Sequence, residues 1–499
     1  MKKNYFLGID NGGSSIKCVV FDQYGSSISQ ESIKVPLHHT SEGFTERDSA
    51  ALWEANCLII RRALLRAALN PVDISGISLS GYGGGLILLD AKANPMYPII
   101  VSTDSRADLL LEKFQKNGTD QKIYERTLQH LWSGQQAMLL TWMKLHRPDV
   151  LEKATHILSI KDYLRYKLTG EFATEPTDAS NTNLFNLYSK SFDSEIFRIL
   201  GLEGYNFALP KLLKPCSLAG KVTEKAAIQT GLLEGTPVAA GLYDVASCTL
   251  ASGIMNEDTL SLIVGTWSIS GHLTKNIKEC EGRNNGMAAF LDGWYFSEES
   301  SPTSTSNLDW FTDRFYQYLK PAPDVNVYEY CNQLASGISP DENDLIFIPY
   351  LYGSNTVAGA RGGFFNLSGY HTQGHILEAI YEGILFSLLT HVNTLYGQSY
   401  PQKARFSGGA SRSPFWCQML SDILGIPVEV TDCEELGALG AAICAAVSTN
   451  TYADFSEATK NMSHISRTYL PDHVRHVIYA KKYQKYQKAI KALEYFYGE

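Results

Sequence analysis

Two short apolar runs near the start of the chain flank a knot of small and polar residues, in the stretch from Phe6 to Asp22. Runs of this length, bounded by glycines and serines, predict two strands joined by a tight hairpin loop. Gly12 and Gly13 permit positive φ angles and close approach of a ligand, while Ser14 and Ser15 add hydroxyl donors. The pattern therefore predicts a hairpin whose loop can meet a ligand.

The same plan returns half a chain later, in the run Leu-Ser-Leu-Ile-Val-Gly-Thr-Trp-Ser-Ile at 260–269. An apolar strand again leads through a glycine and a hydroxyl residue, here Gly265 and Thr266, into a second apolar strand. The repeat predicts two related α/β domains, an N-terminal one over 1–246 and a C-terminal one over 247–499.

Helical periodicity follows each hairpin. Apolar residues recur at three- and four-residue spacing between Ser49 and Leu69, with Asp48 as the predicted N-cap and Asn70-Pro71 as the predicted end. The apolar run from Leu436 to Val447 is shorter than the ~20 residues of a membrane span, so it predicts a buried helix.

Three loops carry candidate chemistry, and the first of them is the Gly12 loop. Successive backbone N–H groups in the Gly12 loop can bind an anion, and Asp10 beside them suits magnesium, although an ordinary hairpin turn remains an alternative. Asp244 follows a predicted strand, where α/β proteins often place chemistry, or it is only the N-cap of the next helix. The run Phe406–Pro414 leads a strand through glycines into a helix, which suits a phosphate or a nucleoside or is merely a turn.

Composition narrows the classes of function. The chain has 499 residues, 44% of them hydrophobic, and a formal net charge of −9. Such a charge argues against a general nucleic-acid or anionic-membrane binder. Nine scattered cysteines favour reduced thiols, and no secretory segment precedes the first strand. We therefore expect a cytoplasmic enzyme without nucleic-acid or membrane partners, and a homodimer stays open.

In their order and spacing, these segments resemble the FGGY carbohydrate kinases over essentially the whole chain. The segments that carry the resemblance are Asp10-x-Gly-Gly-Ser-Ser, Ser80–Gly85, Asp104-x-Arg106, Gly241-Leu-Tyr-Asp244, Gly265-Thr266, Gly408-Gly409-Ala410 and Glu435-x-x-Ala-Leu-Gly-Ala-Ala. The resemblance implies an actin-like α/β fold of two ribonuclease-H-like domains with a deep cleft, in which ATP, Mg²⁺ and a small sugar meet.

The resemblance also implies a role for individual residues. Asp244 is the expected catalytic base, and Asp10 the expected magnesium contact. The sugar side is expected to hold Ser80, Gly81, Tyr82, Gly83, Gly84, Asp104, Arg106 and Tyr243. The residues expected to bind ATP are Gly12, Gly13, Ser14, Ser15, Lys17, Gly265, Thr266, Gly408, Gly409, Ala410 and Ser413.

The chain departs from the family pattern in two places. Gly83-Gly84 replaces larger side chains that the D-xylulose and glycerol kinases carry, so we expect lost polar contacts, open space and a different preferred sugar. Leu139 replaces a usual lysine, which weakens one family signature. The implied acceptor is a ketopentose or keto-gulonate, while another sugar or polyol, an actin-fold ATPase without a sugar, and a non-catalytic sugar sensor remain alternatives.

Overall fold

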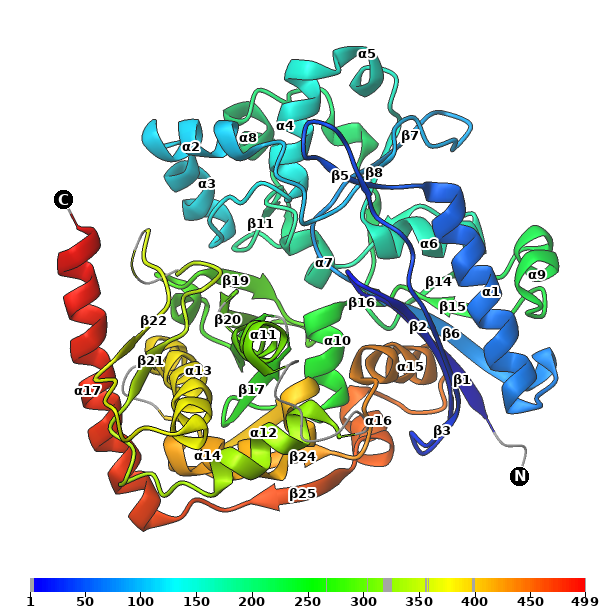
Figure 1. The fold of residues 1–499 in the computed structure, drawn as a ribbon. Helices are drawn as coiled ribbons and strands as arrows, with labels where there is room; N and C mark the ends of the chain where they lie inside the picture. Colours follow the sequence, from blue (N-terminus) through cyan, green and yellow to red (C-terminus); the bar gives the residue numbers. More distant parts are fainter. Residues whose placement is uncertain are drawn as a thin grey trace. The chain divides into compact units, whose positions relative to one another are not determined.

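The computed structural model describes residues 4–265, 267–302, 304–316, 325–354, 357, 359–396 and 400–498. The chain divides into two compact units (Figure 1). Unit 1 holds 1–255, 273–296 and 435–464, and unit 2 holds 256–272, 297–434 and 465–499. Each unit therefore combines distant parts of the sequence, and the division of the chain after residue 246 stays a prediction.

The centre of unit 1 is a mixed sheet with the strand order β14-β15-β6-β1-β2-β3, and β16 also pairs with β6. β1 and β2 form the predicted hairpin, antiparallel from Tyr5↔Asp22 to Asn11↔Ile16, and β6 runs parallel to β1. The strands are β1 Tyr5–Asn11, β2 Ile16–Asp22, β3 Ser27–Ile33, β6 Ile74–Gly81, β14 Leu218–Lys221, β15 Pro237–Ala239 and β16 Leu242–Tyr243.

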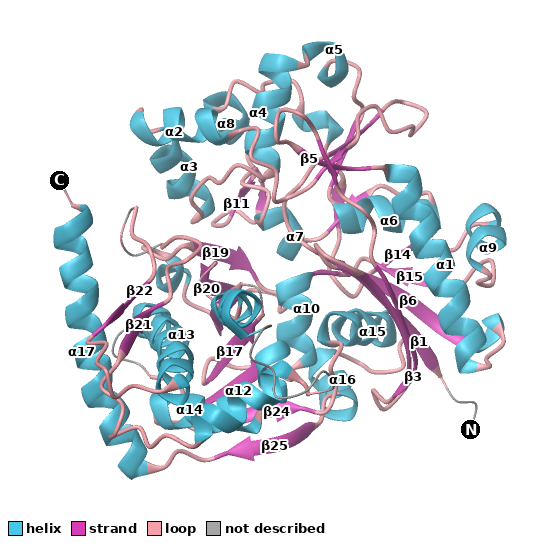
Figure 2. Cartoon of the chain, viewed as in Figure 1, coloured by secondary structure: helices cyan, strands magenta, loops and turns pink. Residues whose placement is uncertain are grey.

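Helices cover both faces of this sheet (Figures 1 and 2). Because side chains alternate along a strand, Leu7 and Ile9 of β1 join the apolar core under α1, Ser49–Ala67. Gly8 faces the other way, toward α15, Leu436–Ser448, and a Cβ there would lie 1.9 Å from the carbonyl oxygen of Ala438. Glycine therefore allows the predicted buried helix to pack directly on the strand.

α1 begins and ends through different signals. Asp48 caps it as predicted, because its side chain accepts a hydrogen bond from the backbone N–H of Ala51. The predicted end at Asn70-Pro71 is wrong: the helix ends at Ala67, its C-cap Ala68 adopts the left-handed conformation, and Pro71 begins a 3₁₀ turn. A left-handed C-terminal residue is a common helix stop even without glycine.

The rest of unit 1 consists of short helices and small sheets. Its helices are α2 Asp108–Lys116, α3 Thr119–Thr127, α4 Gln136–His146, α5 Pro148–Leu151, α6 Ile160–Thr169, α7 Pro176–Ser180, α8 Ser194–Ile199, α9 Glu224–Thr230, α10 Asp244–Ala251 and α16 Phe455–Met462. Its short strands are β4 His38–His39, β5 Thr45–Arg47, β7 Ile87–Leu89, β8 Ile99–Ile100, β9 His156–Leu158, β10 Ala173–Thr174, β11 Phe185–Asn186, β12 Ser191–Phe192, β13 Lys211–Leu212 and β19 Asn285–Ala288.

Unit 2 is organised around a second mixed sheet in which β20, β18, β17, β23, β24 and β25 lie in that order. β17 and β18 form the second predicted hairpin, and β23 runs parallel to β17. The strands are β17 Thr259–Val264, β18 Ser268–Thr274, β20 Tyr295–Ser301, β21 Ile346–Ile348, β22 Gly363–Phe365, β23 Lys403–Ser407, β24 Val428–Thr431 and β25 Ile465–Tyr469.

Helices complete the core of unit 2 around Leu260, Leu262 and Phe406 of its sheet. They are α11 Ser306–Phe311, α12 Val327–Ser336, α13 Gln373–Tyr396, α14 Pro414–Leu424 and α17 His473–Tyr497, with a π-helical turn at Thr312–Tyr316 and a 3₁₀ turn at Gly409–Arg412. Within the described ranges, no helix has the length and apolar character that crossing a membrane requires.

Candidate active site

The carboxyl ends of three neighbouring parallel strands meet in unit 1. Asp10 of β1 lies opposite Ser80 of β6, and Ser80 lies opposite Leu242 of β16. One position further on, Gly81 pairs with both Asn11 and Tyr243. Because ligands of α/β sheets bind at the carboxyl ends of the strands, this edge is the candidate site of unit 1.

Asp244 follows the end of β16 directly. It is the first residue of α10, and Tyr243, not Asp244, occupies the N-cap position. The N-cap position considered for Asp244 is therefore wrong, and its role in catalysis stays a prediction. Asp244 is half-buried, and its Oδ1 accepts a hydrogen bond of 2.7 Å from the backbone N–H of Val245, so the helix start fixes the orientation of a carboxylate beside Tyr243.

Asp10 lies in a confined polar setting. Its Oδ1 accepts a 2.6 Å hydrogen bond from Ser80 Oγ. Burial raises the pKa of the Asp10 carboxyl, whereas the Ser80 hydrogen bond and the charge of Lys17 oppose this shift. Lys17, on β2, in turn forms a 2.6 Å ion pair with Glu435.

The start of α15 lies against Asp10, which the sequence did not predict. A Cβ at Gly437 would lie 2.6 Å from the Asp10 carboxylate, so only glycine fits between them. The positive end of a helix dipole favours a carboxylate there. Glu435 and Gly437 lie at the start of the helix that the sequence predicted only as buried, and nothing in the sequence indicated that this helix start lies beside Asp10.

The β1–β2 loop is open. Gly13 and Ser14 are exposed, and a Cβ at Gly13 would meet no atom within 4 Å. Neither Gly12 nor Gly13 uses the positive φ that glycine permits. Ser15 is half-buried. Glycine here leaves the backbone accessible and does not relieve strain.

A buried arginine supports this loop from behind. The Nη2 atom of Arg47, on β5, donates a 3.0 Å hydrogen bond to the carbonyl oxygen of Gly13. Arg47 is 2% exposed, and among the described residues its Nε and Nη1 atoms find no partner. The buried hydroxyl of Tyr82 likewise has no partner there; burial raises its pKa and the charge of Arg47 lowers it. Nothing in the sequence singled out Arg47 except its place just before Asp48.

The glycine loop after β6 is tightly enclosed, which contradicts the open space predicted for Gly83 and Gly84. A Cβ at Gly83 would lie 1.6 Å from Asn181 Nδ2 and 2.7 Å from the Tyr243 ring. A Cβ at Gly84, whose φ is +73°, would lie 2.7 Å from the Trp132 ring. Side chains from other segments fill the space that the glycines leave.

Asp104 and Arg106 are paired with each other. The Arg106 Nε–Asp104 Oδ1 distance is 2.7 Å, Arg106 Nη2 lies 2.9 Å from Glu46 Oε1, and the Arg106 and Asp104 side chains are both 0% exposed. The guanidinium also lies over the rings of Phe44 and Trp142. Since these polar groups are occupied within the protein, their expected contact with a sugar stays a prediction.

A layer of buried charges supports the strand ends. Lys161 of α6 lies 2.6 Å from Asp162, 3.4 Å from Asp178 and 3.7 Å from Glu175. Its Cβ also lies 3.2 Å from where a Cβ of Gly81 would be. Thr177, beside Asp178, accepts a 3.0 Å hydrogen bond from the backbone N–H of Tyr243. Through Thr177, the cluster of buried charged residues is thereby connected to the backbone of Tyr243, next to Asp244.

Unit 2 holds the other predicted ligand residues. Gly265 follows β17, and its carbonyl oxygen accepts a 2.7 Å hydrogen bond from Thr305 Oγ1; Thr266 lies outside the described residues. Gly408 follows β23 with a φ of +93°, and a Cβ there would lie 2.3 Å from the carbonyl oxygen of Val264. Ser413 caps α14 by accepting from the backbone N–H of Trp416.

A pocket of about 480 Å³ lies beside these residues. Gly409, Ala410 and Ser413 line one part of it, and the aromatic side chains of Tyr381 and Trp416 line another. Apolar walls with a few polar groups are typical of small-molecule sites of this volume. The structure thus brings three of the predicted nucleoside-binding residues to one pocket.

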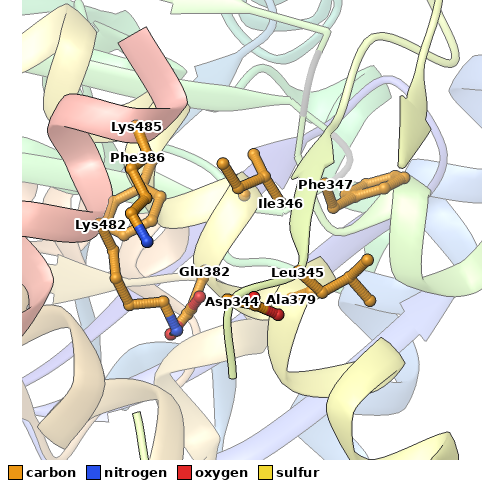
Figure 3. A pocket seen from close by; sticks show the side chains of 10 residues that line it. Asp344, Leu345, Ile346, Phe347, Ala379, Glu382, Phe386, Lys482 and Lys485 are labelled. Carbon is orange, nitrogen blue, oxygen red and sulfur yellow. The ribbon is translucent and has the colours of Figure 1, made fainter. Parts of the chain in front are cut away.

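A second pocket of unit 2 is too small for a ligand. Lys482 of α17 reaches Glu382 of α13 there and forms an ion pair (Figure 3). Burial raises the pKa of Glu382 to about 8, and Lys482 opposes the shift. The cavity volume is about 10 Å³, close to the minimum for one water molecule. The Lys482–Glu382 ion pair at this cavity joins the C-terminal helix α17 to α13.

Comparisons with known proteins show the family of this chain. The N-terminal-domain model of the FGGY family of carbohydrate kinases matches residues 5–251, and the C-terminal-domain model matches 260–449. The chain is 36% identical over 496 residues to L-xylulose/3-keto-L-gulonate kinase of Escherichia coli K12, covering 99% of this chain and 98% of that protein.

Solved structures match as well. A ligand-bound xylulose kinase and a gluconate kinase, both from Lactobacillus acidophilus, each superpose with a TM-score of 0.90 at 23% identity and cover 99% of this chain and of their own. Two equally good matches thus carry different sugar names. At this identity the likeness shows the fold and leaves the sugar open.

Proposed function

Since this chain belongs to the FGGY family of carbohydrate kinases and is thus an ATP-dependent sugar kinase, we propose that its acceptor is L-xylulose or a related ketopentose or keto-gulonate. The family, the actin-like class of fold and the kinase activity predicted from the motifs are confirmed. The observation that carries the proposed acceptor is the 36% identity along nearly the full length of an L-xylulose/3-keto-L-gulonate kinase.

Asp244 is the proposed base. An aspartate with an ordinary pKa near ~3.9 is too weak to deprotonate a sugar hydroxyl before reaction. It acts by orienting the hydroxyl and accepting its proton as the oxygen–phosphorus bond forms. Its fixed position at the start of α10, next to Tyr243, supports this role.

The residues around Asp10 fit a magnesium ion. Mg²⁺ in kinases is usually held by one or two carboxylates together with phosphates and water, and Asp10 offers one carboxylate beside the open Gly12–Ser15 loop. Bound there, the ion would neutralise charge on the phosphates. Ser80 and the start of α15 orient the carboxylate, while the loop amides and Lys17 would contact the phosphates.

The pocket of unit 2 is the proposed adenosine site. Tyr328, which lines the pocket and is 46% exposed, offers an aromatic surface to a base, and the exposed Gly409 leaves the backbone accessible. Gly265 and Thr266 are proposed to meet the phosphates.

A cytoplasmic location and a homodimeric state remain predictions. Light scattering of the purified protein tests the homodimeric state.

A coupled assay of ADP release tests the proposed function. The purified chain is supplied with ATP and Mg²⁺ and with L-xylulose, D-xylulose, 3-keto-L-gulonate, gluconate, erythritol or glycerol in turn. The proposal requires the highest kcat/KM with L-xylulose or the keto-gulonate. Preference for gluconate, erythritol or glycerol would replace the proposed acceptor class, and preference for D-xylulose would replace L-xylulose within it. ADP release that no acceptor alters would favour an ATPase without a sugar.

A further inference from the structure

Asn181 lies where a side chain of residue 83 would begin. Its Nδ2 atom is 1.6 Å from the position that a Cβ of Gly83 would take, and its Cγ is 2.8 Å away. Gly83 does not have a positive φ, so its backbone would accept an L side chain. The obstacle to any side chain at 83 is therefore Asn181, together with the ring of Tyr243.

Asn181 is largely buried, at 7% exposed, but its carboxamide atoms are not among the fully buried polar atoms that lack a partner. None of the side-chain hydrogen bonds found between described residues on this segment involves that carboxamide. On either side of it, Asn183 Nδ2 donates to Gln135 Oε1, and the carbonyl oxygen of Ser180 accepts from Gln129 Nε2. The flanking residues are thus fixed, while the Asn181 amide next to Gly83 can bond a ligand.

The surroundings point to the acceptor sugar. Gly83 follows the end of β6, and Tyr243, whose ring also faces Gly83, immediately precedes Asp244. The Trp132 ring, from a different segment, lies beside Gly84 and adds an aromatic wall next to the same glycine loop. An amide that both donates and accepts suits a sugar hydroxyl or carbonyl oxygen.

We propose that Asn181 binds the acceptor sugar and determines its specificity, by placing a carboxamide in the space that a side chain at position 83 would occupy. This inference rests on the proposed function. It assigns Gly83 a role as well: the glycine is required because Asn181 occupies its side-chain space. Positions 83 and 181 then form an exchangeable pair in which only one residue carries a side chain into the site.

The first test removes the amide. Asn181→Ala should lower kcat/KM for the preferred sugar about 10-fold, mainly through a higher KM, because one hydrogen bond to a substrate is lost. The KM for ATP and the thermal midpoint should stay at the wild-type values. Asn206→Ala is the matched control, since Asn206 is an exposed asparagine of the same unit. Asn181→Ser offers a milder change if the alanine variant folds poorly.

The second test uses the steric pair. Gly83→Ala alone should lower kcat/KM for the sugar strongly, because its methyl group meets Asn181. In the Asn181→Gly background the same change should cost at least about 5-fold less, which is a coupling expected for residues in direct contact. The double variant should also change the ranking of the sugars.

The outcomes separate this inference from the proposed function. If Asn181→Ala equals the wild type in kcat/KM for every accepted sugar, or if its loss comes with an equal rise in the KM for ATP, Asn181 does not bind the sugar. Independent effects of Gly83→Ala and Asn181→Gly would also overturn the inference. If the wild type prefers another sugar, the proposed acceptor fails, and the same variants measured with that sugar still decide the role of Asn181.

Discussion

The two hairpin units share one plan and differ in chemistry. In each, an antiparallel hairpin is followed by a parallel strand that leads into a glycine loop: β1–β2 with β6 in unit 1, and β17–β18 with β23 in unit 2. In unit 1, Ser80 donates to the carboxylate of Asp10. In unit 2, Ser407 lies opposite Ile263 and donates to the backbone carbonyl of Leu262.

This difference shows how one scaffold serves two tasks. At the strand ends of unit 1, carboxylates lie in confined positions, as chemistry at a defined point requires. At those of unit 2, the residue opposite Ser407 is apolar, and a pocket of about 480 Å³ with aromatic walls lies beside the glycine turn. The comparison predicts that changes in unit 1 alter turnover and that changes in unit 2 alter nucleotide binding.

The largest expected effect is at Asp244. Asp244→Ala should lower kcat at least ~10²-fold, because the group that orients the hydroxyl and accepts its proton is lost. ATP binding, measured by calorimetry, should remain. The control is Asp149→Ala, which removes an exposed carboxylate from the same unit. A variant with near-wild-type turnover would remove Asp244 from the mechanism and with it the catalytic role of unit 1.

A smaller effect is expected at Gly408 in unit 2. Gly408→Ala places a methyl group 2.3 Å from the Val264 carbonyl oxygen, at a φ that side chains rarely adopt, so the turn must shift. We expect the KM for ATP to rise about 10-fold and the free energy of unfolding to fall by about 1–3 kcal/mol. The KM for the sugar should not change.

Gly369→Ala is the matched control for Gly408→Ala, because a Cβ at Gly369 meets no atom within 4 Å. Kinetic constants for ATP and sugar at varied concentrations of each separate the two effects. If Gly408→Ala raises the KM for the sugar as much as that for ATP, the division of tasks between the units is wrong.

The sequence predicted what is local. Apolar runs bounded by glycine identified both hairpins, and Asp48 identified the start of α1. These features depend on residues that are close together in the sequence, so they can be predicted from the sequence alone. The order of glycine and carboxylate segments was enough to indicate the family.

What the sequence could not predict depends on distant packing. Glycines at 83 and 84 indicated open space, yet Asn181 and Trp132, remote in sequence, fill it. The start of α15 contacts Asp10 across more than four hundred residues, which no spacing rule reveals. The burial of Arg47, whose Nε and Nη1 atoms find no partner among the described residues, is likewise a property of the folded chain.

The smallest expected effect concerns the buried charges behind the strand ends of unit 1. Burial and the neighbouring carboxylates of Asp162 and Glu175 raise the pKa of Asp178 from 3.8 to about 7, although Lys161 opposes the shift. The folded protein therefore holds this proton more tightly than the unfolded chain. The resulting stabilisation is fully present below about pH 4 and is lost as the pH rises through about 7.

Asp178→Asn should therefore flatten the dependence of stability on pH, because an amide resembles the protonated acid and does not ionise. Near pH 4 the thermal midpoints of variant and wild type should agree, and the variant should melt progressively higher than the wild type as the pH rises to 8.5, by a few degrees at the end of the range. Asp149→Asn, on the exposed surface, controls for a change in net charge. Parallel melting profiles of Asp178→Asn and wild type from pH 5.5 to 8.5 would show that Asp178 is ionised throughout, and that the layer supporting unit 1 is held by ion pairs alone.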